Sequence, residues 1–137
     1  MRIIYKTEEG GVAVLIPTPE YLQDHTIEEL AAKDVPEGAE FEIVKDSDVP
    51  SDRTFRGAWE KVGKAIEANI IKAKVLTKDR LREERKPLLE TQDILFNRAL
   101  EGNEDTSVIV AEKNRLRNIT KQVDGMKTLD ELKGVSV

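Results

Sequence analysis

The side chains that most often carry catalysis or bind metals are scarce in this chain of 137 residues. It has no cysteine and a single histidine, which excludes disulfides, thiolate metal sites and thiol nucleophiles. His25 precedes a capping threonine and has no expected carboxylate or metal-ligand partner nearby in the sequence, so we interpret it as a surface histidine. No nucleophile elbow, phosphate-binding loop or zinc-protease motif occurs. The sequence therefore predicts a protein that is not an enzyme and that needs neither a metal nor a cofactor.

Three aspartates in the middle of the chain have a spacing that resembles a metal-binding loop. Asp46, Asp48 and Asp52 would take the first, third and seventh positions of a calcium-binding loop. Proline then falls on the fifth position and glycine on the twelfth, where an EF-hand requires a glutamate. We therefore expect Asp48 or Ser51 to cap a turn or a helix end instead.

Two of the six aromatic residues follow these aspartates at a spacing of four. Phe55 and Trp59 would share one face if this segment were helical, and Arg53 and Arg56 flank them. One interpretation is that the two rings seal a sheet against the next helix. The other is that they anchor a partner protein, since buried aromatic side chains dominate binding at many interfaces.

The elements before this segment read as a small sheet. Residues 2–6 and 12–16 are rich in β-formers and are separated by Gly10 and Gly11, which favour a turn. Thr26 and Glu29 form a capping box before a short helix, and residues 41–45 alternate between apolar and polar side chains. The order predicts an antiparallel sheet of three strands with one short helix.

From Trp59 onward the apolar spacing becomes helical, and we expect a long helix followed by an antiparallel αα-hairpin of residues 88–100 and 107–123. Pro87 falls inside this pattern, so it either kinks the long helix or breaks it. The fold class is therefore α+β, with a β-rich subdomain over 1–58 and a helical subdomain over 59–137. A narrow stripe on the first helix has no partner within the chain, which predicts self-association or docking. The predicted partner-binding residues are Phe55, Trp59, Val62, Ile66, Ile70 and Leu81.

Charge is unevenly distributed between the two predicted subdomains. Residues 1–58 carry six Lys or Arg and thirteen Asp or Glu, whereas residues 59–137 carry sixteen and fourteen. Residues 72–86 hold seven basic and three acidic side chains; a solvated helix face explains this stretch best, with an acidic protein surface or a nucleic acid as alternatives. The net charge of −5 argues against a nucleic-acid partner, and no apolar run is long enough for a membrane span. The charged N-terminus does not match a signal peptide, so we expect an intracellular protein.

Two blocks of this sequence resemble proteins of tailed bacteriophages. The first is DVPSDRTFRGAWE, residues 48–60, and the second comprises residues 82–93, 98–101 and 113–122. The second block resembles the C-terminal region of tail assembly chaperones and tail-fibre assembly proteins. Its matching positions are Leu88, Leu89, Asp93, Leu116, Arg117 and Ile119. The family often ends in a tail containing Pro and Trp, which residues 126–137 lack.

The resemblance implies a chaperone that binds a phage tail or tail-fibre protein in the host cytoplasm and is either released or retained on the virion tail. It implies neither catalytic residues nor a cofactor. We also expect a homo-oligomer, from the unpartnered helical stripe. The first alternative is a permanent virion subunit such as a baseplate or fibre adaptor. The second is a regulatory or nucleic-acid-binding protein that uses residues 72–86.

Overall fold

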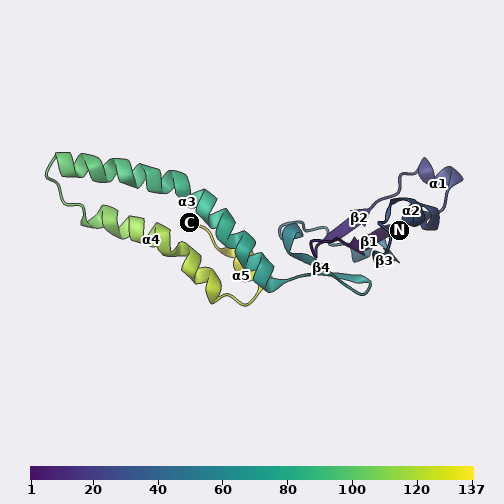
Figure 1. The fold of residues 1–137 in the computed structure, drawn as a ribbon. Helices are drawn as coiled ribbons and strands as arrows, with labels where there is room; N and C mark the ends of the chain where they lie inside the picture. Colours follow the sequence, from purple (N-terminus) through teal and green to yellow (C-terminus); the bar gives the residue numbers. More distant parts are fainter. The chain divides into compact units, whose positions relative to one another are not determined.

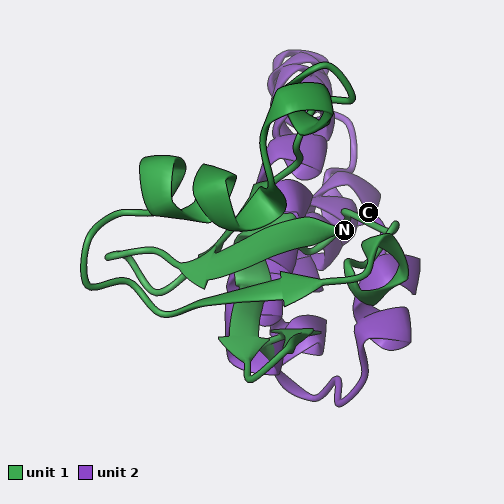
Figure 2. Ribbon diagram, turned by 90° about the vertical axis from the view of Figure 1, so that its right-hand side faces the viewer, with its two compact units in different colours: residues 1–69 green, residues 70–137 purple.

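The computed structural model describes all 137 residues, which fold into two compact units, residues 1–69 and residues 70–137 (Figures 1 and 2). The first unit holds a small antiparallel sheet and the second is helical, which confirms the predicted α+β class. The division falls after Asn69, later in the chain than the predicted division before Trp59.

The first unit is built on the predicted sheet of three antiparallel strands, whose order in space is β2-β1-β3. They are β1 (Arg2–Lys6), β2 (Val12–Leu15) and β3 (Phe41–Val44). The turn between β1 and β2 places Gly10 at a φ of 86°, a conformation that glycine adopts without steric cost. In this strand order β1 is central and pairs with both neighbours, and the outer edge of β2 is unpaired.

Ile3 and Ile4 point to opposite faces of the sheet because side chains alternate along a strand. On the Ile3 face lies helix α2 (Ile27–Asp34), preceded by the short helix α1 (Tyr21–Asp24). The Thr26 side chain accepts a hydrogen bond from the Glu29 N–H, which confirms the predicted capping box. The Ile4 face is covered by a second, two-stranded sheet.

That second sheet is a β-hairpin of β4 (Trp59–Val62) and β5 (Ala65–Ala68), where the sequence analysis predicts the start of a long helix. The helical prediction is therefore wrong for these residues. The hairpin turns at Gly63, whose φ of 60° suits a two-residue loop. An apolar spacing of four fits a strand face as well as a helix face, so the spacing alone does not distinguish them. Trp59, Ile66 and Ala68 pack on the Ile4 face.

Two short 3-10 turns connect the sheets, at Asp46–Asp48 and Arg56–Ala58. Phe55 directly precedes the second of these turns, and Trp59 begins β4. No α-helix therefore carries Phe55 and Trp59 on a common face. Phe55 and Trp59 are both buried, so their first interpretation as core residues is the one that matches the structure, although Trp59 lies in a hairpin and not beside a helix.

The second unit consists of α3 (Ile70–Glu101), α4 (Ser107–Asp124) and α5 (Leu129–Gly134). Pro87 lies inside α3, which continues through it without a break. The short loop after Glu101 reverses the chain, so α3 and α4 form the predicted αα-hairpin (Figure 1). α5 begins with a hydrogen bond from the Glu131 N–H to the Thr128 hydroxyl, and the helix packs against α3.

Candidate functional site

The six residues predicted to bind a partner do not form one stripe. Phe55 and Trp59 are buried in the first unit and Leu81 is fully buried in the second. Val62 is half exposed on the β-hairpin, and Ile66 packs against the core of that unit. Ile70 begins α3 and is partly buried. A continuous helical surface from Val62 to Leu81 is therefore excluded, since the first part of it is strand.

The three aspartates with loop-like spacing have local partners. The Asp48 carboxylate accepts a hydrogen bond from the Lys45 N–H at 3.0 Å and closes the first 3-10 turn, which confirms its predicted capping role. Asp46 lies 3.0 Å from the Met1 amino group. Asp52 accepts from both the N–H and the hydroxyl of Thr54. These carboxylates stabilise turns and do not converge on one point.

His25 has a carboxylate partner, and the expectation that it lacks one nearby is wrong. Its Nδ1 lies 2.9 Å from Glu29 Oε2, and its ring stacks on Tyr21 with the ring centres 4.5 Å apart. Both side chains of the His25–Glu29 pair are about half exposed, at 51% and 55%. The pair orders the start of α2 and lies on the surface, as predicted for this histidine.

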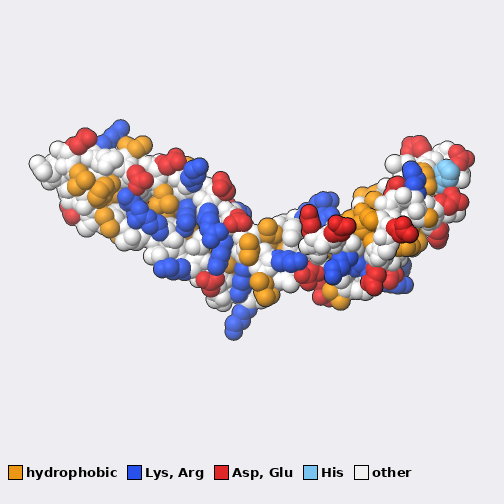
Figure 3. Space-filling model, viewed as in Figure 1, with side chains coloured by type: hydrophobic (Ala, Val, Ile, Leu, Met, Phe, Trp, Pro, Cys, Tyr) orange, Lys and Arg blue, Asp and Glu red, His pale blue; other side chains and the backbone are white.

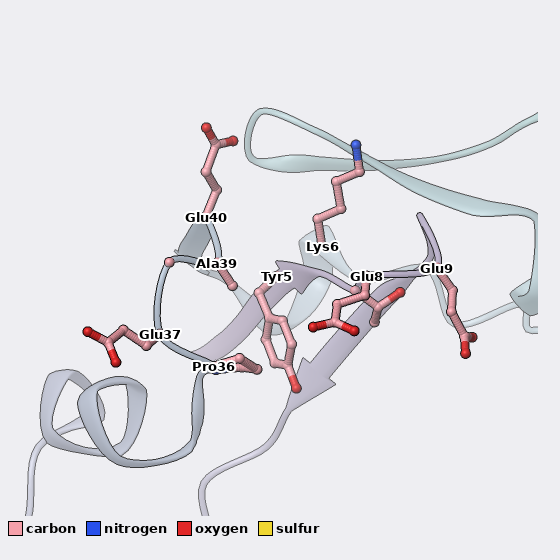
Figure 4. A pocket seen from close by; sticks show the side chains of 10 residues that line it. Tyr5, Lys6, Glu8, Glu9, Pro36, Glu37, Ala39 and Glu40 are labelled. Carbon is pink, nitrogen blue, oxygen red and sulfur yellow. The ribbon is translucent and has the colours of Figure 1, made fainter.

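An open cleft of about 820 Å³ lies at one end of the three-stranded sheet, between the turn after β1 and the turn before β3 (Figure 4). The Tyr5 ring lies in its middle, near Pro36. Four glutamates and one lysine give the cleft an acidic character: Glu8, Glu9, Glu37, Glu40 and Lys6. The Glu37 and Glu40 carboxylates point away from one another, so they offer no convergent set of ligands.

Four of the seven basic side chains in residues 72–86 contact other parts of the second unit. Lys74 donates to the backbone oxygen of Asp124 at 3.1 Å, and Lys78 forms a salt bridge with the Asp124 carboxylate. The hydrogen bond from Lys78 holds the pKa of the Asp124 carboxyl below its usual value, and the charges of Lys78 and Lys74 lower this pKa further. These two lysines thus satisfy the C-terminal end of α4, where cations interact favourably with the helix dipole.

Two arginines of the same stretch also reach backbone carbonyls of other helices. Arg80 donates to the Leu132 oxygen at 3.2 Å and to the Val135 oxygen at 2.7 Å, at the end of α5. Arg85 donates to the Arg117 oxygen on α4 at 2.8 Å. The interpretation as a solvated helix face is therefore incomplete, since this face also holds α4 and α5 in place.

The free end of the αα-hairpin has a different surface. We define the hairpin tip as residues 88–112 and the hairpin base as the remainder of the second unit, and α5 belongs to the base. Ala99 is the only buried residue of the tip. Hydrophobic side chains appear on its surface in Figure 3. The large exposed ones are Leu88, Ile94, Leu95, Leu100, Val108 and Val110.

The tip lies outside the predicted interaction surface, whose helical stripe runs from Val62 to Leu81. Six of the thirteen large exposed apolar side chains of the whole chain lie within the 25 residues of the tip. The signal that could have located it is the short α5, because a short third helix covers only part of a long hairpin.

Comparison with known proteins leaves the family of this chain open. No family model matches it, and no curated protein or solved structure is significantly similar to it. None of its helices combines the length and the apolar character needed to cross a bilayer.

Proposed function

We propose that this chain is an assembly chaperone for a phage tail or tail-fibre protein, which acts by protein–protein binding and without catalysis. The observation that supports the proposal is the hairpin tip, whose apolar side chains are exposed on both α3 and α4. Concentrated apolar surface on a folded protein commonly marks a site of protein binding. The phage partner itself follows from the resemblance of residues 82–93 and 113–122 to tail assembly proteins.

The arrangement of the tip favours binding to helices. Leu88 and Leu95 are spaced by seven, so they lie on one side of α3 and expose 42% and 41% of their surface. Two helices alone cannot enclose such side chains, whereas a third or fourth helix packed along the hairpin can. We therefore propose that the tip takes up either a helix of the tail protein or the tip of a second copy, which accounts for the expected homo-oligomer.

Co-expression with the tail-fibre subunit encoded beside this gene tests the proposal. We expect the chain to co-purify with the subunit and to raise the yield of folded fibre trimers. The double variant Leu88→Ser/Leu95→Ser should lose both effects while keeping its helical content by circular dichroism. Ile71→Ser/Val75→Ser is the matched control, because these side chains are also apolar and exposed but lie in the hairpin base. That control should behave as the wild type.

The proposal fails if the fibre folds and trimerises equally well without the chain. Mass spectrometry of purified particles separates a chaperone from a permanent virion subunit. A chaperone that is released is absent from the particles, whereas stoichiometric recovery would identify a structural subunit and contradict release.

A further inference from the structure

A second pocket lies in the first unit, on the sheet face that the β4–β5 hairpin covers. It encloses about 210 Å³. Three arginines line it together with apolar side chains, and no acidic residue does. The full lining is Arg2, Val14, Ile16, Val49, Pro50, Ser51, Arg53, Arg56 and Trp59. This composition is unexpected in a unit that carries fifteen acidic and eight basic residues.

Arg56 and Arg53 are crowded in this pocket. The Arg56 guanidinium lies 4.5 Å from the centre of the Trp59 ring, in a cation–π arrangement. Burial lowers the pKa of Arg56, and the positive charge of Arg53 lowers it further. Like charges that line one pocket repel one another, and a bound anion would relieve the repulsion.

Arg2 lines the same pocket and carries an unsatisfied donor. Its Nε is inaccessible to solvent and has no hydrogen-bond partner. The Asp46 carboxylate lies 3.5 Å away, too far for a good hydrogen bond, and it also binds the Met1 amino group at 3.0 Å. A buried donor without an acceptor is costly, so Arg2 adds a third positive charge to the pocket lining without a satisfied hydrogen bond at Nε.

The apolar part of the lining and the neighbouring strand indicate what carries the anion. Val14 belongs to β2 and Ile16 follows it directly, so the pocket lies beside the end of that strand. The outer edge of β2 is unpaired, and an extended peptide can add to such an edge through main-chain hydrogen bonds. The pocket is smaller than typical sites for drug-sized ligands, which suits a carboxylate with a short apolar neighbour.

We infer that this pocket binds a carboxylate of an extended peptide segment that adds to the free edge of β2. The carboxylate comes from a C-terminus or from an Asp or Glu side chain, and the guanidinium groups of Arg53 and Arg56 receive it through charge-assisted hydrogen bonds. This inference rests on the proposed function as a protein-binding module and names the chemistry of a second bound segment. Its site is in the first unit, whereas the hairpin tip is in the second.

Titration of the full chain with short peptides tests it. Trp59 is the only tryptophan and lines this pocket, so fluorescence excited selectively at tryptophan and not at Tyr5 or Tyr21 reports on it. The first probe is acetyl-Thr-Val-Thr-Val with a free C-terminal carboxylate, compared with its C-terminal amide. The second is acetyl-Thr-Val-Glu-Val amide, compared with the same peptide carrying Gln. In at least one pair we expect the carboxylate form to bind ten times more tightly or better, and the pair that responds identifies the source of the carboxylate.

Arg53→Ala is the variant that removes the proposed contact, and Lys6→Ala is its control. Both lose one positive charge from the same unit, but Lys6 lines the acidic cleft and not this pocket. We expect Arg53→Ala to weaken binding at least tenfold and Lys6→Ala to leave the Kd within twofold. N-methylation of the peptide backbone should weaken binding as well, because it removes main-chain donors to β2.

The inference is overturned if neither carboxylate peptide shifts the Trp59 fluorescence, or if Arg53→Ala binds as the wild type does. It is also overturned if sodium sulfate or inorganic phosphate competes as strongly as the peptides, which would describe an unspecific anion site. A wild-type chain that supports fibre assembly but binds none of the peptides would refute the pocket alone. A wild-type chain that binds the peptides but has no effect on fibre assembly would refute the assembly role alone.

Discussion

The two ends of the αα-hairpin bury their apolar side chains to very different degrees. In the hairpin base, eight residues are buried, and they come from three helices and the segment after α5: Ala73, Thr77, Leu81, Leu116, Ile119, Val123, Leu132 and Val135. In the hairpin tip only Ala99 is buried, although its helices are as rich in leucine, isoleucine and valine. The same two helices thus form a closed core at one end and an open one at the other.

The difference follows from α5. It packs against α3, and Leu132 of α5 together with Val135 directly after it forms a third apolar layer over the base. α5 spans six residues while α3 spans 32, so it covers only part of the hairpin. In a helix pair without a third layer, apolar side chains at the flanks of the contact between the two helices stay exposed to water. The comparison shows that exposure at the tip arises from the length of α5 and not from a change in the sequence pattern.

The largest expected effect comes from a pair of identical substitutions in the two regions. Leu81→Ala removes a fully buried side chain from the base and should lower the free energy of unfolding by about 2–5 kcal/mol. Leu95→Ala removes a side chain that is 41% exposed and should cost less than about 1 kcal/mol. Urea denaturation of the full chain, followed by far-ultraviolet circular dichroism, measures both.

Protein concentration provides the control for this pair. If Leu95→Ala were as destabilising as Leu81→Ala, the tip would already be covered, and the comparison between base and tip would fail. If the destabilisation caused by Leu95→Ala increased with protein concentration, a second copy of the chain would be what covers the tip. Dissociation of the two copies then contributes to unfolding.

A smaller effect is expected from the arginine that holds α5. Arg80 donates to two carbonyls at the end of α5, and its side chain is 38% exposed. Arg80→Ala should cost roughly 1–2 kcal/mol, because hydrogen bonds from charged donors are stronger than those from neutral donors. Hydrogen exchange of the α5 amides should accelerate most, since the substitution loosens the third layer over the base.

Arg82→Ala is the matched control for this substitution. Arg82 bonds only to Asp79 on the same helix, and both side chains are more than half exposed, so its loss should cost less than about 0.5 kcal/mol. Equal acceleration of α5 exchange in both variants would show that Arg80 does not hold this helix.

Local signals in the sequence were sufficient for most of the fold. Three of these signals each depend on a few neighbouring residues and are found in the structure: the glycine turn after β1, the capping box at Thr26 and the short loop after Glu101. The β4–β5 hairpin could not be recognised in the same way. Its apolar spacing matches a helix, and burial against Ile4 decides in favour of strands.

The candidate sites depend on contacts between distant parts of the chain. The arginine pocket joins Arg2 to Arg53 and Arg56, and the β-hairpin that helps form it was predicted as helix. The exposure of the tip depends on how far α5 extends along α3. Local sequence spacing encodes neither of these long-range contacts. The sequence therefore indicates which residue types occur at these sites but not how they come together.

The smallest effect concerns the pH dependence of the hairpin base. The pKa of Asp124 is lowered in the folded chain, chiefly by the hydrogen bond from Lys78, so the unfolded chain binds more protons than the folded one at mildly acidic pH. The Asp124 carboxylate therefore makes its full contribution to the free energy of unfolding above the ordinary carboxyl pKa, near 4. This contribution is lost as the pH falls through the lowered pKa. Urea midpoints between pH 6 and pH 3 should fall less steeply for Asp124→Asn than for the wild type. Asp130→Asn is the control, because Asp130 is an exposed carboxylate without a salt bridge, and this variant should retain the wild-type slope. If Asp124→Asn also retained the wild-type slope, the lysines would not stabilise the end of α4 through the Asp124 charge.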